Sequence, residues 1–112
     1  MNFAFDVALN RPAGIRDFAA TVGDQFTVAI ALYDLDGDAA TANLTGSTAK
    51  IEIIRCADVE LSITGTIAFG VATFDFGGSD LSGIVGRNVF RCKLTRSGKV
   101  ATVVRGSFTV AD

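Results

Sequence analysis

The sequence lacks histidine and tryptophan altogether, and it contains only one proline and two cysteines. Without histidine, neither the Ser-His-Asp nor the Cys-His arrangement of hydrolases can be built, and imidazole metal ligands are excluded too. No glycine-rich phosphate loop with its lysine is present either. With no nucleophile, base and orienting group to combine, we predict a protein that is not an enzyme and has no catalytic residues, cofactor or metal.

Acidic residues are crowded in the segment DLDGD, where Asp34, Asp36 and Asp38 occupy alternate positions. Carboxylates in this pattern begin a calcium loop of the EF-hand type, which needs glycine at its sixth position and glutamate at its twelfth. Here Gly37 is the fourth residue and Thr45 is the twelfth. We therefore interpret the segment as a turn, and a bound cation is the weaker alternative.

The two cysteines, Cys56 and Cys92, are expected to be reduced and mostly buried, with a single disulfide as the less favoured alternative. This expectation depends on the amino terminus, where residues 1–9 alternate in polarity and do not form the apolar core of a secretory signal. No stretch approaches the length of a membrane span. We expect the chain to mature in a cytoplasm and to have no membrane partner.

The charge is low and unevenly distributed. Charged residues are 20% of the chain, hydrophobic residues 49%, and the net charge is −2, which argues against nucleic acid as a partner. Six basic residues and no acidic one lie within residues 87–105: Arg87, Arg91, Lys93, Arg96, Lys99 and Arg105. The acidic bend with Asp34, Asp36 and Asp38 and this basic segment are candidate contacts between copies or with other partners, and an ordinary solvated surface is the alternative.

Alternation of apolar and polar residues predicts short strands separated by turns of Gly, Asp, Asn and Ser. The fold class is accordingly all-β, an antiparallel immunoglobulin-like β-sandwich of about seven to nine strands. Residues 22–55 are expected to hold the central strand pair, joined by a hairpin at Asp36-Gly37, and a second hairpin is predicted at residues 96–99. In residues 89–95 the side chains of Phe90, Cys92 and Leu94 should face inward. Residues 79–86 form either one helical turn or a loop that buries Leu81 and Ile84.

The chain is predicted to be one domain, with residues 1–21 as an N-terminal strand or arm and residues 22–112 as the sandwich. Phe3, Phe5 and Val7 lie on one face of the first strand. This strand is either an edge strand of the fold or an arm that pairs with a neighbouring subunit, because unpaired strand edges are templates for strand addition.

Residues 22–55 contain an ordered series of short motifs, namely Gly23-Asp24-Gln25-Phe26, Leu32, Asp36-Gly37, Leu44-Thr45-Gly46 and Lys50-Ile51. The series resembles the N-terminal immunoglobulin-like domain of the phage baseplate upper protein family. In that family a Gly-Asp pair opens a strand, an Asp-Gly turn follows, and a Leu-Thr-Gly step leads into the next strand. The later half is similar over residues 86–94 and in Gly98 with residues 105–110.

The resemblance implies a structural phage virion protein, a non-enzymatic module of a tail, baseplate or fibre attachment point assembled in the host cytoplasm. Its partners would be other virion proteins and copies of itself, as a homo-oligomer in the particle. A capsid decoration protein is one alternative. A module that binds carbohydrate at a host surface is another, but tryptophan is absent and Tyr33 is the only tyrosine that could stack on a sugar.

Overall fold

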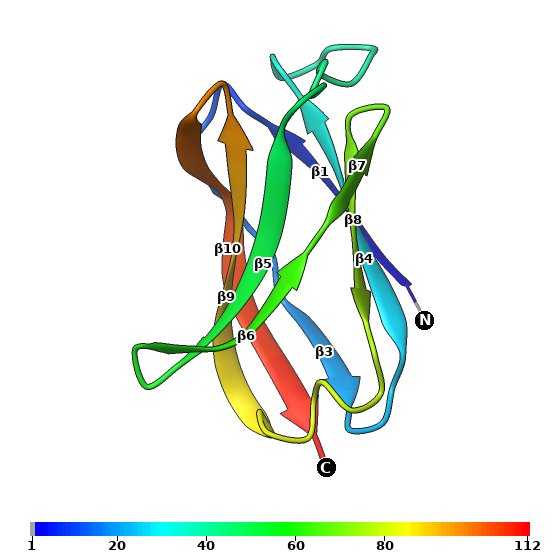
Figure 1. The fold of residues 1–112 in the computed structure, drawn as a ribbon, viewed down its shortest axis with the longest axis vertical. Helices are drawn as coiled ribbons and strands as arrows, with labels where there is room; N and C mark the ends of the chain where they lie inside the picture. Colours follow the sequence, from blue (N-terminus) through cyan, green and yellow to red (C-terminus); the bar gives the residue numbers. More distant parts are fainter. Residues whose placement is uncertain (1) are drawn as a thin grey trace.

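The alternating apolar residues form ten β-strands in a computed structural model, which describes residues 2–112 (Figure 1). The strands make two sheets that face each other across an apolar core. Sheet A contains, in spatial order, β1 (Asn2–Ala8), β4 (Phe26–Tyr33), β8 (Val71–Phe76) and β7 (Thr66–Ala68). Sheet B contains β2 (Gly14–Ile15), β10 (Lys99–Ala111), β9 (Gly86–Arg96), β5 (Thr48–Arg55) and β6 (Asp58–Thr64), with β3 (Phe18–Thr21) also paired to β10.

The all-β prediction is confirmed, although the strands differ from the expected antiparallel set. Three pairings are parallel: β1 with β4, and both β2 and β3 with β10. The strands outnumber the expected seven to nine partly because Gly65 separates β6 from β7, where the chain crosses from sheet B to sheet A. A Cβ at Gly65 would lie 2.6 Å from the Phe74 ring. Residues 2–112 form no helix that is long and apolar enough to cross a membrane.

Aromatic side chains from both sheets meet in the core around Phe18 of β3. Its ring centroid lies 4.4 Å from that of Phe108 and 4.9 Å from that of Phe90 in sheet B, and 5.1 Å from that of Phe3 in sheet A. The inward positions predicted for β9 are confirmed, since Phe90, Cys92 and Leu94 are at most 3% exposed. Because these rings belong to different strands, their packing ties the two sheets together.

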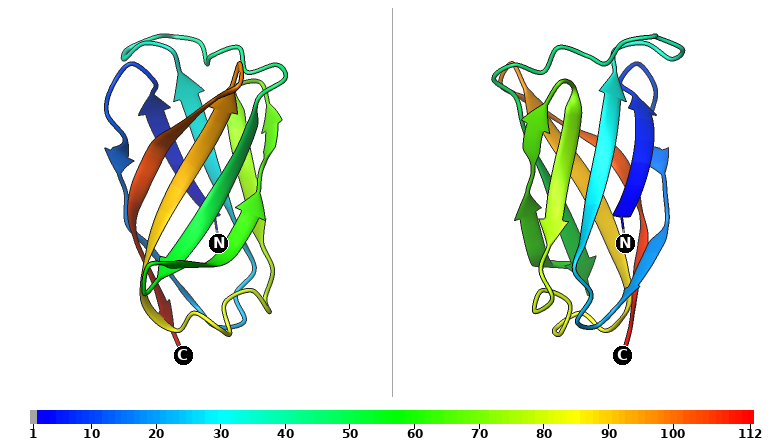
Figure 2. Two further views of the ribbon diagram at one scale, coloured as in Figure 1. Left: turned by 60° about the vertical axis from the view of Figure 1, so that its left-hand side comes forward. Right: turned by 90° about the vertical axis from the view of Figure 1, so that its right-hand side faces the viewer.

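The N-terminal segment is part of both sheets. β1 lies beside β4 along its whole length, from the pair Asn2 and Thr27 to the pair Ala8 and Tyr33 (Figure 2). Val7 on β1 and both Phe18 and Ala20 on β3 are buried in the core. The expected division between an arm of residues 1–21 and a sandwich from residue 22 therefore has no counterpart in the packing, and β1 is an edge strand of sheet A.

The expected hairpin at Asp36-Gly37 is corrected, because β4 and β5 lie in different sheets. Residues 34–47 cross from sheet A to sheet B over one end of the core. Ala42 and Leu44 are buried along this crossing, and the Ala42 N–H donates to the Leu32 carbonyl at 2.7 Å. The burial of Ala42 and Leu44 thus fixes the path of this connection between the two sheets.

Two further local predictions are confirmed. β9 and β10 form the hairpin expected at residues 96–99, and its two central residues, Ser97 and Gly98, have φ values of 52° and 76°. Positive φ at both central residues is the signature of a type I′ turn. In the segment 79–86 the loop alternative is correct, because it contains no helix and buries Leu81 and Ile84.

Candidate interaction surface

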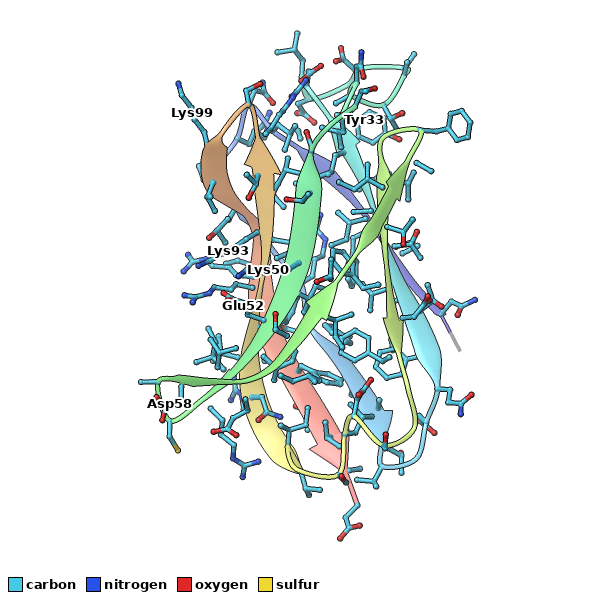
Figure 3. The ribbon with its side chains drawn as sticks, viewed as in Figure 1. Tyr33, Lys50, Glu52, Asp58, Lys93 and Lys99 are labelled. Carbon is cyan, nitrogen blue, oxygen red and sulfur yellow. The ribbon has the colours of Figure 1, made fainter. Side chains whose placement is uncertain are left out.

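The outer face of sheet B carries an ion cluster centred on Glu52 of β5. Its carboxylate lies 2.7 Å from Arg91 Nε, 3.3 Å from Lys93 Nζ and 3.4 Å from Lys50 Nζ. Lys50, Glu52 and Lys93 gather on the outer side of β5 and β9 (Figure 3). Strand register makes the cluster, because Glu52 is directly opposite Arg91 and Lys50 is opposite Lys93.

The Glu52 carboxyl is held in its ionised form. Its side chain is 8% exposed. The hydrogen bond from Arg91 lowers the pKa of Glu52, burial opposes this, and the hydrogen bond from Lys93 lowers the pKa further. Three cations surround one carboxylate, so this part of the surface keeps an excess of positive charge. Arg91 and Lys93 were expected at an exposed basic surface, whereas Glu52 and Lys50 were not singled out by sequence reasoning.

The acidic bend is paired with cations of its own chain. Asp34 Oδ1 lies 2.7 Å from Arg96 Nη1, and Asp36 Oδ2 lies 2.6 Å from Arg11 Nη2. The Asp38 carboxylate accepts a hydrogen bond from the Leu35 N–H at 3.1 Å. Within residues 2–112 no three Asp, Glu or Cys side chains come together as a metal site. Asp34 of the acidic bend and Arg96 at the end of β9 thus form an ion pair within the same molecule. This pairing limits the charge that the two residues present to a partner.

The remaining predicted basic residues, Arg87, Lys99 and Arg105, are exposed and make no ion pair within the described part of the chain. Arg105 stands next to Arg91 across the β9–β10 ladder. Beside these two arginines a groove of about 460 Å³ runs over the outer face of sheet B. Its lining includes Pro12, Ala13, Ile54, Val89, Arg91 and Arg105.

The apolar face of β1 points into the molecule. Val7 is buried, while Phe3 and Phe5 are half-buried and packed against the core. What β1 leaves open is its outer backbone edge, since it is the last strand of sheet A. Part of this edge is covered, because Arg16 Nη2 donates to the Asp6 carbonyl at 3.2 Å. Strand addition at β1 would therefore use backbone groups and not the phenylalanine side chains.

The two cysteines have opposite environments, and both are free thiols. Cys92 is buried as expected, and burial raises the pKa of its thiol to about 12. Cys56 is exposed, which corrects the expectation that both would be buried. It lies with Ala57 at the tip of the β5–β6 turn, between the end of β5 and the start of β6, so its side chain lies outside the core.

Sequence reasoning missed several exposed apolar side chains at turns. Phe69, at the β7–β8 turn, is 94% exposed, and Leu35 in the acidic bend is 56% exposed. An open cavity of about 610 Å³ lies between the β7–β8 turn and residues 41–47. Local patterning could not identify these residues, since an apolar side chain next to a predicted turn is equally compatible with burial, as Leu44 shows.

Comparison with protein-family models and with curated proteins gave no match. Solved structures gave matches in fold. The N-terminal domain of ORF48 from phage TP901-1 aligns over 100% of both chains with a TM-score of 0.64 and 13% identity. An uncharacterised protein from Bacillus anthracis str. Ames aligns over 93% of this chain and 89% of its own, with a TM-score of 0.46 and 14% identity. The cysteine protease inhibitor EhICP2 from Entamoeba histolytica has a TM-score of 0.44 and 11% identity, and covers 97% of this chain and 96% of its own. Identities this low show likeness of fold alone.

Proposed function

We propose that this chain is a structural component of a phage virion, a non-enzymatic module that assembles in several copies at a tail, baseplate or fibre attachment point. The observation that carries the proposal is the fold match over the full length of both chains to a domain of a phage protein, at a TM-score of 0.64.

The strand order supports an immunoglobulin-like interpretation of the sandwich. The order β1-β4-β8-β7 corresponds to strands A, B, E and D of that architecture, and the order β5-β9-β10 corresponds to C, F and G. β1 departs from this arrangement, because it runs parallel to β4. A sandwich with β1 at the edge of one sheet suits a module that is built into a larger assembly, because edge strands are templates for strand addition.

The test is to place an epitope tag at the C-terminus, where Asp112 is exposed, in the host that carries the gene, and to purify particles from it. We expect the tagged chain to co-sediment with washed particles in several copies, with immunogold label at the tail end. Label over the head would favour the capsid decoration alternative. A tagged chain that is expressed but absent from intact particles would overturn the virion role.

Carbohydrate binding is a second candidate, favoured by one specific observation. Phe69 is 94% exposed at the rim of the 610 Å³ cavity, whose lining contains no charged residue. Its ring supplies the exposed aromatic surface that the sequence did not reveal. Binding of the isolated chain to a glycan array that is lost in Phe69→Ser would support this function. If the chain binds no glycan, the carbohydrate function is contradicted and the assembly role remains.

A further inference from the structure

We propose that copies of this chain associate head to tail, with Leu35 in the acidic bend of one copy inserted into the groove on sheet B of the next. This contact rests on the proposed assembly role and names the surfaces through which self-association takes place. The two partner surfaces belong to different regions of the molecule. One is the connection after β4, and the other crosses β5, β9 and β10.

The groove has an apolar floor with cations beside it. Ile54 and Val89 are neighbours across the β5–β9 ladder, and Val89 is 56% exposed. Pro12 and Ala13, from the connection between β1 and β2, line the groove as well. Arg91 and Arg105 stand next to one another in the β9–β10 ladder and are the two charged residues of the lining. An occupant that matches this groove carries an apolar side chain with carboxylates close to it.

The acidic bend has that chemistry. Leu35 is 56% exposed and lies between Asp34 and Asp36 in the sequence, with Asp38 three residues on. The bend is held in shape from within, because the Asp38 carboxylate accepts from the Leu35 N–H at 3.1 Å and the Asp38 N–H donates to the Leu35 carbonyl at 3.2 Å. A loop ordered before contact loses less conformational entropy when it binds.

Charge favours this pairing over two like surfaces meeting. Arg105 has no ion-pair partner within residues 2–112, and only the Nε of Arg91 is bound to Glu52. The Arg11–Asp36 pair joins side chains that are 65% and 56% exposed, so its contribution is small and Asp36 can exchange partners at little cost. Asp36 and Asp38 of one copy would thus face Arg91 and Arg105 of the next.

The geometry is heterologous, since each copy offers one bend and one groove. Such contacts propagate into rings or open chains and do not stop at a two-fold dimer. One loop in one groove is a small interface, and interfaces well below about 1,200 Å² are typically weak. The association should accordingly depend on concentration in solution and be strengthened where other virion proteins hold the copies close together.

The test uses sedimentation velocity of the full chain at low salt, up to a protein concentration of about 1 mM because weak contacts are expected. Leu35→Ser removes the inserted side chain, and Arg105→Glu places a carboxylate in the groove. Each should weaken association at least about tenfold. Lys99→Glu is the matched control, because it makes the same change of charge at an exposed residue outside the groove lining.

A one-to-one mixture of the two variants separates this contact from others. The Leu35→Ser chain keeps its groove and the Arg105→Glu chain keeps its bend, so the mixture should form dimers and nothing larger. Wild-type protein should continue to larger species. A mixture that stays monomeric, or one that assembles as far as the wild type, would contradict the proposed contact.

A spin label gives a second readout that detects weak association. A nitroxide can be attached to Cys56, which is exposed, while Cys92 is buried and its pKa of about 12 keeps it unreactive. Cys56 is two residues from Ile54 in the groove. Nitroxide-labelled protein at natural isotope abundance is mixed with ¹⁵N-labelled Cys56→Ser protein, which carries no nitroxide. The nitroxide should broaden the amide signals of residues 34–38 in the ¹⁵N-labelled protein. The broadening should disappear when the ¹⁵N-labelled chain also carries Leu35→Ser.

Wild-type protein that stays monomeric at every concentration and shows no broadening would overturn the contact. That result leaves the virion role standing if the tagged chain is still found in purified particles. If the chain associates through this contact but never enters particles, the contact stands and the virion role is contradicted. The two proposals can therefore fail separately.

Discussion

The two faces of sheet B follow the same alternating pattern but are stabilised in different ways. On β9 the inner side chains Phe90, Cys92 and Leu94 are at most 3% exposed, whereas the outer Arg91 and Lys93 are partly exposed and bound to Glu52. Burying one large apolar side chain contributes roughly 1.5–3 kcal/mol, while an exposed ion pair contributes about 0–1 kcal/mol. The inner face of sheet B therefore contributes much more to the stability of the fold than the outer face does.

The strongest test of this difference is Phe18→Ala on the inner face. Phe18 is 6% exposed and contacts rings from both sheets, so the substitution leaves a large cavity. We expect the free energy of unfolding to fall by about 3–5 kcal/mol. Urea denaturation followed by circular dichroism measures it, with Phe69→Ala as the control because Phe69 is 94% exposed. Equal losses in the two variants would contradict the assignment of Phe18 to the core.

Gly106→Ala tests the close backbone approach between β10 and the segment that joins β2 to β3. A Cβ at Gly106 would lie 1.6 Å from the Arg16 carbonyl oxygen, so β10 or the β2–β3 segment must move. We expect a loss of about 1–3 kcal/mol in the free energy of unfolding, as for an overpacked core. The Arg16 amide, which donates to the Arg105 carbonyl, should also exchange faster with solvent.

Gly83→Ala is the matched control for that substitution. A Cβ at Gly83 meets no atom within 4 Å, and its φ is not in the left-handed region. The control should change stability by less than about 0.5 kcal/mol, which is usual for surface sites. If Gly106→Ala were equally mild, the close approach of β10 to Arg16 would be wrong.

The inner face is also the part of the fold that the sequence predicted well. Alternation identified Phe90, Cys92 and Leu94, and the turn residues identified the hairpin at Ser97-Gly98. Partner choice between strands was not predicted, because alternation describes one strand at a time. It therefore missed the parallel pairing of β1 with β4, the placement of β4 and β5 in different sheets, and the role of Phe18.

On the outer face the next test is Glu52→Gln. The substitution removes the carboxylate that lies between Arg91, Lys93 and Lys50 and leaves three like charges together. We expect a loss of about 1–2 kcal/mol at low salt, less than for a fully buried pair because the cations are partly in water. Denaturation at low and high salt measures it, and the loss should shrink as salt screens the repulsion.

Glu60→Gln is the control for Glu52→Gln, since Glu60 is exposed on β6. It should be close to neutral. A similar loss in both variants would show that overall charge, and not the local cluster, causes the effect.

The candidate surface was predictable only in part for the same reason as the fold. The basic composition of residues 87–105 was visible, but the position of Glu52 opposite Arg91 depends on the register of β5 against β9. The pairing of Asp34 with Arg96 depends on where residues 34–47 cross between the sheets. Leu35 and Phe69 became candidates only when their exposure was known.

The pH dependence of stability should report the Glu52 cluster and Asp17. The Arg91 hydrogen bond lowers the pKa of Glu52, and the Ser107 backbone and hydroxyl hydrogen bonds lower that of Asp17. Each group contributes stability above its unfolded pKa, ordinarily 4.5 and 3.8, and this contribution is lost as the pH falls through the lower folded value.

Acidification below about pH 4.5 should therefore reduce the free energy of unfolding progressively. Urea titrations at a series of pH values measure the slope. Glu52→Gln should make the slope shallower, because the substituted side chain no longer titrates. An unchanged slope in that variant would mean that Glu52 is not held ionised by its neighbours.

The smallest expected effect is at the β5–β6 turn, where two residues other than glycine adopt positive φ. Cys56 has a φ of 53° and Ala57 a φ of 69°. The left-handed conformation costs an L-residue about 1–2 kcal/mol, and glycine avoids it at the expense of about 0.4–1 kcal/mol of unfolded-state entropy. Ala57→Gly should thus raise the free energy of unfolding by roughly 0–1.6 kcal/mol.

Ala101→Gly is the counterpart, because Ala101 is exposed within β10, where glycine is expected to destabilise by about 0.5–1 kcal/mol. If urea denaturation shows that Ala57→Gly raises the free energy of unfolding and Ala101→Gly lowers it, the backbone of the β5–β6 turn is strained at Ala57. A loss in Ala57→Gly would instead mean that the Ala57 methyl group makes contacts that outweigh the strain. In either case the magnitude should stay well below that of Phe18→Ala, since the turn lies outside the core that ties the two sheets together.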